Sequence, residues 1–160
     1  MNPTKTITIK VALTKAQNLC ATQEKCISDI SKKLFDWKLP SKDHDTVINL
    51  LLEDKFIDEQ RYAVFYAKDK FKYNKWGKIK IEYTLKQKNI SSENIKSALD
   101  KILETEYDKL LESELIKKFK TIKDSDEYTI KSKLVRFAIS RGFENGKVFD
   151  IVSSIIEKLN

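Results

Sequence analysis

A threefold internal repeat limits what this 160-residue chain can fold into. Seven apolar positions recur at offsets of 51 and then 53 residues, and each set spans the turn between two amphipathic helices. The sets are Ile30, Leu34, Leu39, Val47, Ile48, Leu51 and Leu52; Ile81, Leu85, Ile90, Ala98, Leu99, Ile102 and Leu103; and Leu134, Ala138, Phe143, Ile151, Val152, Ile155 and Ile156. Helices can align by chance, but a shared turn is harder to obtain that way. The repeat therefore predicts tandem units that each contact mainly their neighbours.

Helical spacing of apolar residues predicts three helices in each unit. The expected ranges are Thr4–Ala21, Thr22–Trp37, Ser41–Asp54, Asp58 to a break at Asn74–Gly77, Gly77–Lys88, Ser91–Leu103, Thr105–Lys120, Tyr128–Arg141 and Asn145–Leu159. Thr22 and Asp58 are expected N-caps, and the helix-ending slot is Lys38, Asn89 and Gly142 in turn. Three glycines and two prolines leave little turn chemistry for sheets. We therefore expect an all-α, elongated, gently curved solenoid with units at residues 1–54, 55–103 and 104–160.

The stretch Arg61–Lys88 in the middle unit carries most of the functional signal. It holds nine Lys or Arg and two acidic residues, a local charge of +7 that equals the formal charge of the whole chain. Aromatic residues lie between the lysines, which is typical of surfaces that bind nucleic acid or another anion. The repeat divides this stretch into two helices and assigns most of its aromatics to the core, above all Tyr62, Phe65 and Tyr66. The lysines remain the candidates for binding.

Two interpretations of these lysines stay open. They could pair with phosphates, which would make binding sensitive to salt, or they could form a solvated face. Along the second helix of the middle unit the candidates are Lys75, Lys78, Lys86 and Lys88, and a weaker basic set occupies the equivalent helix of the third unit, at Lys131, Lys133, Arg136 and Arg141. Trp76 could stack on a partner or anchor the core.

The usual catalytic and cofactor motifs are absent from the sequence, so we expect neither an enzyme nor a bound cofactor or metal. Cys20 and Cys26 are expected to be buried free thiols on consecutive helices. No run of residues approaches the length of a membrane span, and the first residues lack the apolar segment of a signal peptide. A cytoplasmic protein without a membrane partner is expected.

Four segments of the chain form a recognisable series: FIDEQRYA (Phe56–Ala63), KWGKIKI (Lys75–Ile81), LKQKNI (Leu85–Ile90) and RFAISRGF (Arg136–Phe143). They resemble the RecX family of RecA regulators, and their order and spacing agree with that family from about Ala12 onward. Asn89 and Lys38 stand where the family commonly has glycine. The first unit is the least similar.

The resemblance implies a solenoid of three helical units that binds the RecA–DNA filament in its helical groove. It implies inhibition of ATP hydrolysis, strand exchange and SOS activation, by a protein expected to act as a monomer, with DNA as a secondary partner. Asp58, Gly77 and Gly142 match family motif residues and read as a helix cap, a break and a helix stop. The expected contact residues are Arg61, Lys68, Lys72, Lys75, Trp76, Lys78, Lys86, Lys88, Lys131, Lys133, Arg136 and Arg141. The alternative is a helical nucleic-acid-binding protein that acts without RecA.

Overall fold

The computed structural model describes residues 6–158 and is helical throughout that range, without a strand. Its elements are α1 (Ile9–Thr22), α2 (Ile27–Asp36), the short 3-10 helix η1 (Ser41–Asp43), α3 (His44–Glu53), α4 (Glu59–Tyr73), α5 (Lys78–Gln87), α6 (Ser92–Asp100), α7 (Glu104–Phe119), α8 (Glu127–Ser140) and α9 (Asn145–Glu157). None of these helices is long and apolar enough to cross a membrane.

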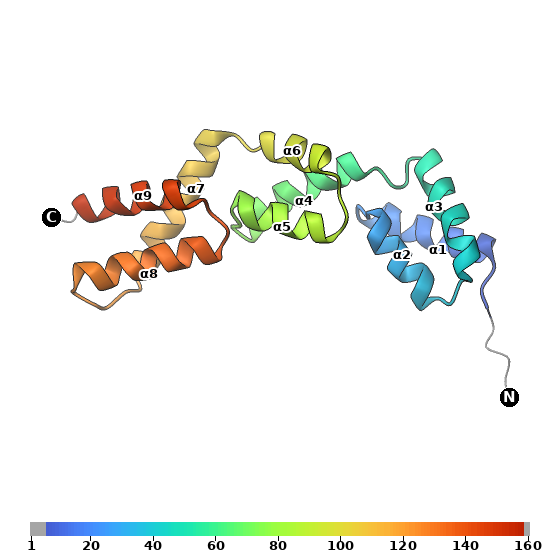
Figure 1. Ribbon diagram of the computed structural model, residues 1–160, viewed down its shortest axis with the longest axis horizontal. Helices are drawn as coiled ribbons and strands as arrows, with labels where there is room; N and C mark the ends of the chain where they lie inside the picture. Colours follow the sequence, from blue (N-terminus) through green and yellow to red (C-terminus); the bar gives the residue numbers. More distant parts are fainter. Residues whose placement is uncertain (1–5, 159–160) are drawn as a thin grey trace, which may run out of the picture.

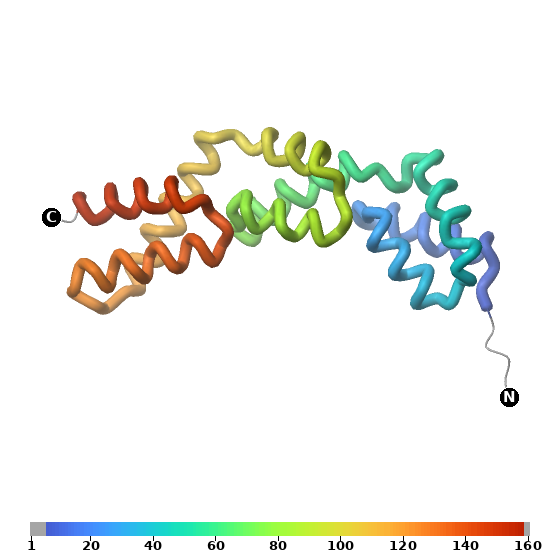
Figure 2. The backbone as a smooth tube through the Cα atoms, in the orientation of Figure 1, coloured from blue at the N-terminus to red at the C-terminus, as the bar shows by residue number. Residues whose placement is uncertain are grey.

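The helices form three groups in a row, which we call unit 1 (α1–α3), unit 2 (α4–α6) and unit 3 (α7–α9) (Figure 1). The row is longer than it is wide and gently curved, with the two ends of the chain at its two ends (Figure 1). The second helix of each unit, α2, α5 or α8, lies along the inner side of the curve, which we call the concave edge (Figure 2). The predicted all-α, elongated solenoid is confirmed. The exact unit boundaries stay a prediction.

The second helices of the three units end in the same way. The residues in the helix-ending slot all have positive φ, +61° at Lys38, +61° at Asn89 and +92° at Gly142. The next residue is buried, and its N–H donates to a carbonyl five residues earlier: Leu39 to Leu34 at 3.1 Å, Ile90 to Leu85 at 3.2 Å and Phe143 to Ala138 at 3.2 Å. This left-handed cap satisfies carbonyls that the helix leaves unpaired, and it reverses the chain toward the third helix.

The predicted helix starts are correct at Asp58 and wrong at Thr22. The Asp58 carboxylate accepts the N–H of Arg61 at 3.0 Å, as an N-cap does. Thr22 instead ends α1, and α2 begins after Cys26, whose N–H donates to the Asp29 side chain at 3.3 Å. The expected start of the first helix, at Thr4, lies outside the described residues, and α1 begins at Ile9 after the cap residue Thr8.

The buried side chains form two apolar clusters. One fills unit 1, and the other runs without interruption through units 2 and 3. Most repeat positions are buried, but the seventh is exposed at Leu52 (37%) and Leu103 (60%), so the repeat overestimates the core there. Phe65 is also 42% exposed, against its assignment to the core, while Tyr62 is buried as expected.

Units 2 and 3 are joined through their backbones. The N–H of Gly77 donates to the carbonyl of Arg141 at 2.8 Å, and the N–H of Ile79 donates to the carbonyl of Gly142 at 3.0 Å. A Cβ added to Gly77 would lie 2.3 Å from the carbonyl of Gly142, so only glycine allows this approach. The Tyr107 hydroxyl accepts the N–H of Lys78 at 2.9 Å and donates to Glu144 at 2.8 Å.

Units 1 and 2 are joined mainly through charged side chains. Arg61 of α4 pairs with Glu24 at 2.6 Å and also donates to the carbonyl of Lys55 at 3.0 Å. Lys88 pairs with Asp29 at 2.9 Å. Burial would by itself raise the pKa of Asp29, but the hydrogen bonds from Lys88 and from the N–H of Cys26 outweigh it and leave that pKa below its ordinary value.

Cys26 adds one apolar contact to this joint, because its buried side chain belongs to the cluster of units 2 and 3 although it precedes α2. Cys20 is half-buried in α1, and both thiols are free. Burial raises the pKa of both thiols, so they are less ionised than an exposed cysteine. The expected buried free thiol is therefore correct for Cys26 and only partly correct for Cys20.

Candidate binding surface

Three predicted lysines in α5 or directly after it, Lys78, Lys86 and Lys88, pair with nearby carboxylates, whereas Lys80 of α5 has no ion pair within the described residues. Lys78 pairs with Glu104 at 3.3 Å, Lys86 with Glu82 at 2.9 Å and Lys88 with Asp29 across the joint of units 1 and 2. Such pairs reduce the charge that α5 offers to a partner. Of the predicted contact lysines in this stretch, those without a carboxylate at ion-pair distance in residues 6–158 are Lys68 and Lys72 of α4 and Lys75 just after it.

Arg61 and Arg141, the two arginines expected to make contacts, serve the joints between units. Arg61 pairs with Glu24 of unit 1. The Arg141 guanidinium donates to the carbonyl of Asn74 at 3.2 Å and lies 5.1 Å from the centre of the Phe137 ring. Trp76 is half-buried against the shared core of units 2 and 3, with the ammonium of Lys80 at 4.6 Å from its ring. These three side chains have clear structural roles.

Three other predicted residues, Lys68, Lys72 and Lys75, line a hollow between α4, the end of α6 and the start of α7. We call it the α4–α7 hollow. Its volume is about 400 Å³, and Lys101 adds a fourth lysine to its rim. Sequence reasoning missed Lys101, because only the fold brings the end of α6 beside α4.

A second basic hollow, the α7–α8 hollow, lies at the far end of unit 3 and has a volume of about 740 Å³. Lys133 and Arg136 line it, as do Lys118 and Lys123, which sequence reasoning missed. Lys133 pairs with Asp124 in the same lining, so one positive charge there is neutralised. Lys131 is exposed on α8 but does not line this hollow.

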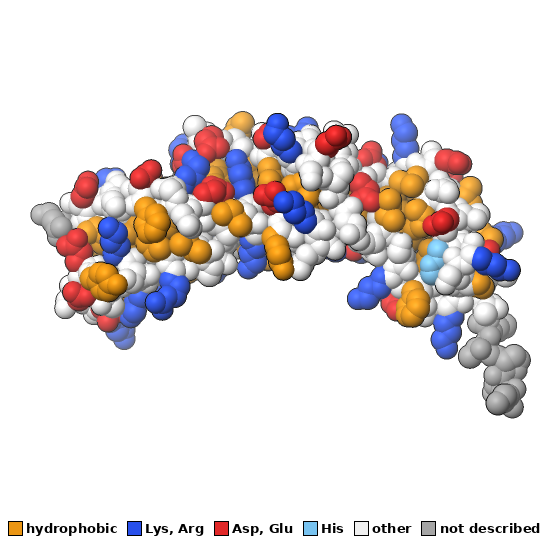
Figure 3. Space-filling view, viewed as in Figure 1, with side chains coloured by type: hydrophobic (Ala, Val, Ile, Leu, Met, Phe, Trp, Pro, Cys, Tyr) orange, Lys and Arg blue, Asp and Glu red, His pale blue; other side chains and the backbone are white. Residues whose placement is uncertain are grey.

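The three second helices, which run along the concave edge, each expose a large aromatic side chain. Phe35 of α2 is 74% exposed, Tyr83 of α5 is 62% exposed and Tyr128 of α8 is 79% exposed. Ile79 of α5 is 50% exposed, so the expected apolar face of that helix is only partly buried. Along this edge hydrophobic side chains alternate with lysine and arginine (Figure 3). Exposed aromatic residues beside cations are typical of protein-binding surfaces.

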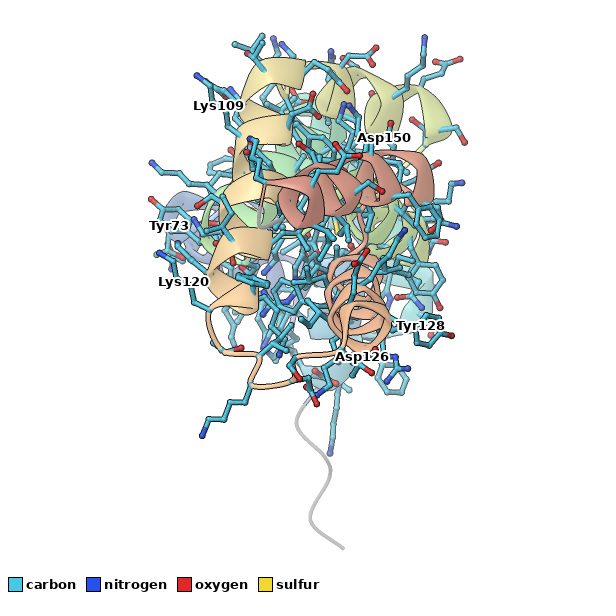
Figure 4. All side chains as sticks on the ribbon, turned by 90° about the vertical axis from the view of Figure 1, so that its left-hand side faces the viewer. Tyr73, Lys109, Lys120, Asp126, Tyr128 and Asp150 are labelled. Carbon is cyan, nitrogen blue, oxygen red and sulfur yellow. The ribbon has the colours of Figure 1, made fainter. Side chains whose placement is uncertain are left out.

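Exposed side chains of different helices project to different sides of the row. Seen from the end of the row, Tyr73 of α4 and Lys109 and Lys120 of α7 project to one side, while Tyr128 of α8 projects to the opposite side (Figure 4). The predicted contact residues therefore do not form one continuous patch. They divide between the concave edge, the two basic hollows and the joints.

Comparison with known protein families matches residues 58–99 to the second three-helix domain of RecX and residues 105–152 to the third. These ranges fall on units 2 and 3 and together cover more than half of the chain. The chain belongs to the RecX family. RecX proteins are named regulatory proteins, in agreement with the family resemblance of the four sequence segments.

Individual RecX proteins are similar over most of this chain. The regulatory protein RecX of Clostridium acetobutylicum is 30% identical over 136 residues, which cover 82% of this chain and 63% of the relative. That of Clostridium beijerinckii is 30% identical over 92% of this chain and 72% of the relative. The chain thus spans less than two thirds of the length of some RecX relatives.

A crystal structure of the regulatory protein RecX has the same fold. It superposes with a TM-score of 0.83 at 22% sequence identity, over 91% of this chain and 73% of the other. At this identity the similarity supports the RecX architecture of stacked three-helix units. It does not carry over any contact residue.

Proposed function

We propose that this chain regulates the RecA recombinase by binding RecA–DNA filaments along their helical groove. The observation that carries the proposal is the concave edge of a RecX-family solenoid, where each of the three second helices exposes a large aromatic side chain. A filament repeats its own surface at regular intervals. A row of three similar units can therefore contact several filament subunits at once, and linked weak contacts add up to strong binding.

The chemistry of the concave edge suits a partner made of protein and nucleic acid. Phe35, Tyr83 and Tyr128 offer apolar area for protein surface. The exposed Lys131 of α8, which does not line the α7–α8 hollow, offers charge to phosphates or to acidic side chains. A protein lying in the groove would restrain ATP hydrolysis, strand exchange and SOS activation by limiting filament extension or favouring disassembly, without a chemical step of its own.

A RecA ATPase titration on single-stranded DNA tests this proposal. The wild-type chain should inhibit at less than one molecule per RecA, and the triple variant Phe35→Ala, Tyr83→Ala and Tyr128→Ala should need at least tenfold more protein for the same inhibition. The control variant removes three exposed apolar side chains elsewhere, Val11, Leu103 and Phe149, which are 47%, 60% and 47% exposed. It should inhibit like the wild type.

Absence of inhibition by the wild-type chain, under conditions that support filaments, would refute regulation of RecA. Equal inhibition by both triple variants and the wild type would refute the concave edge as the contact surface. Circular dichroism of each variant establishes that the fold is retained. Because all six side chains are exposed, their removal should change stability little.

A second candidate function is binding to nucleic acid without RecA, and the α7–α8 hollow favours it. Lys118, Lys123 and Arg136 converge there without a carboxylate at ion-pair distance in residues 6–158. Tight binding of the wild-type chain to bare single-stranded DNA at physiological salt, lost on replacing these three side chains with alanine, would support it. Weak binding to bare DNA together with inhibition of RecA would exclude it as the main function.

The same proposal includes a cytoplasmic monomer, since RecA–DNA filaments form in the cytoplasm and a rod of three units already presents a long surface. Light scattering of the purified chain tests the monomeric state, and a mass twice the 18.7 kDa of the chain would contradict it.

A further inference from the structure

The α4–α7 hollow combines an apolar floor with a basic rim. Its floor is formed by Phe71, Ile102 and Leu110, of which Ile102 is buried and the other two are half-buried. The Phe71 ring stacks on Tyr107, with ring centres 5.9 Å apart and an angle of 22° between the planes. Tyr107 is held in turn by its hydrogen bonds across the joint of units 2 and 3. The floor is therefore rigid and partly open to solvent.

The rim is positively charged and is not neutralised within the described chain. Lys68, Lys72, Lys75 and Lys101 surround the floor, and none of them has a carboxylate at ion-pair distance in residues 6–158. Lys78, Lys86 and Lys88, described above, each have such a partner. Glu106 is the single acidic residue of the lining, which leaves a net charge of +3 around one hollow. Like charges gathered in this way favour an anionic ligand.

The details of the lining favour an acidic peptide over a nucleic acid. The lining has no arginine, the residue that binds phosphate with two parallel hydrogen bonds. Its one aromatic ring, Phe71, is half-buried and already stacks on Tyr107, so it offers little surface to a base. The Glu106 carboxylate can accept an N–H from a peptide backbone, a donor that a phosphate lacks. The apolar floor of Phe71, Ile102 and Leu110 also takes an apolar side chain better than a polar base edge.

We propose that the α4–α7 hollow binds an acidic segment of a partner protein, with one apolar side chain on the floor and flanking carboxylates against the lysine rim. This contact lies outside the concave edge, because its lining comes from α4, α7 and the ends of α4 and α6, not from the second helices α2, α5 and α8. It does not depend on the proposed function, because binding to a peptide is measured without RecA or DNA.

Fluorescence anisotropy of the full chain with a labelled peptide tests the proposal. The probe is one Phe flanked on each side by three Glu. Two matched peptides replace the Phe with Ser or all Glu with Gln, and each replacement should weaken binding roughly tenfold or more, the order expected for losing one buried aromatic side chain or the charge attraction. Raising the salt from about 50 to 300 mM should weaken binding of the parent peptide, because exposed charges are then screened.

The site is tested by the variant Lys68→Ala, Lys72→Ala and Lys101→Ala, which changes only exposed side chains. Its matched control, Lys10→Ala, Lys42→Ala and Lys96→Ala, removes the same charge from exposed positions outside the hollow. The hollow variant should bind the parent peptide at least tenfold more weakly than the control variant.

Three results would overturn the proposal. If the two lysine variants bind the parent peptide equally weakly, the peptide is attracted only by the net charge of the protein. Equal binding of the Phe and Ser peptides would mean that the floor is not used. Binding of a thymidine oligonucleotide that is lost in the hollow variant, with no binding of the peptide, would make the hollow a nucleic-acid site.

Discussion

The backbone contact between Gly77 and Gly142 gives the sharpest test of how units 2 and 3 are joined. In Gly77→Ala the new Cβ would lie 2.3 Å from the carbonyl carbon and oxygen of Gly142. The closest ordinary contact of a Cβ is about 3.4 Å, so the two backbones must separate by roughly 1 Å. That movement breaks the hydrogen bonds from Gly77 to Arg141 and from Ile79 to Gly142.

The expected loss of stability follows from these two bonds. Each contributes about 0.5–1.5 kcal/mol, so about 1–3 kcal/mol is lost. The φ of −79° and ψ of 169° at Gly77 are ordinary for alanine, so the backbone adds no strain. Replacing glycine with alanine also lowers the conformational entropy of the unfolded chain, which raises the free energy of unfolding by about 0.4–1 kcal/mol. The net destabilisation is then about 0–2.6 kcal/mol, with a central value of about 1.3 kcal/mol, or roughly 3–5 °C in Tm at that central value for a chain of this length.

Urea denaturation and amide hydrogen exchange measure the effect. The control is Gly146→Ala in the first turn of α9, where an added Cβ meets nothing within 4 Å and should be neutral or slightly stabilising. In Gly77→Ala the amide of Ile79 should lose protection before the amides inside α5. If both variants change stability equally, or if Ile79 stays protected, the backbone contact is not what joins the units.

Three further predictions concern helix ends and joints. Replacing Lys38 or Asn89 with glycine should raise the free energy of unfolding by up to about 1 kcal/mol each, because both residues have positive φ; urea denaturation showing a loss would contradict the strain argument. Tyr107→Phe should lower the free energy of unfolding by about 1–3 kcal/mol, since it leaves the Lys78 N–H and the Glu144 carboxylate without their hydrogen-bond partner. Burial raises the pKa of Tyr107, so in the folded wild type its phenol should not ionise near pH 10 in an ultraviolet titration. Because the pKa of Asp29 is lower in the folded state than its ordinary value of 3.8, the ionised carboxylate stabilises the fold above that value, and this stabilisation is lost as the pH falls through the folded pKa. The variant Asp29→Asn should therefore be less stable than the wild type at pH 7. Below pH 4 it should lose less additional stability than the wild type, as measured by denaturation at each pH.

Local signals in the sequence were enough to predict the repeated helix pairs. The apolar residues on either side of each helix end, such as Leu34 and Leu39, belong to one cluster and lie only five residues apart, so their pattern is visible in the sequence. The start of α2 was missed for a local reason as well. The Thr22 hydroxyl donates to the carbonyl of Leu19 at 2.8 Å, so this threonine bonds backward into α1 instead of capping α2.

The candidate surface could be predicted only in part, because whether a carboxylate pairs with a lysine can depend on residues far away in sequence. Lys78 meets Glu104 from the next unit, and Lys88 meets Asp29 from the previous one. Neither partner can be identified from helical spacing. The exposure of Tyr83 follows only from the fold, because an apolar stripe in sequence does not show which part of it a neighbouring helix covers.

The contrast between the two joints has a mechanical consequence. Between units 2 and 3, backbone hydrogen bonds and one continuous core resist separation, whereas between units 1 and 2 the resistance comes mainly from Arg61–Glu24 and Lys88–Asp29. Under tension along the row, we expect unit 1 to detach first as a folded body, at a force that falls with added salt. Optical tweezers attached to both ends of the chain would record this as a short extension before either core unfolds, and a single simultaneous rupture would contradict it.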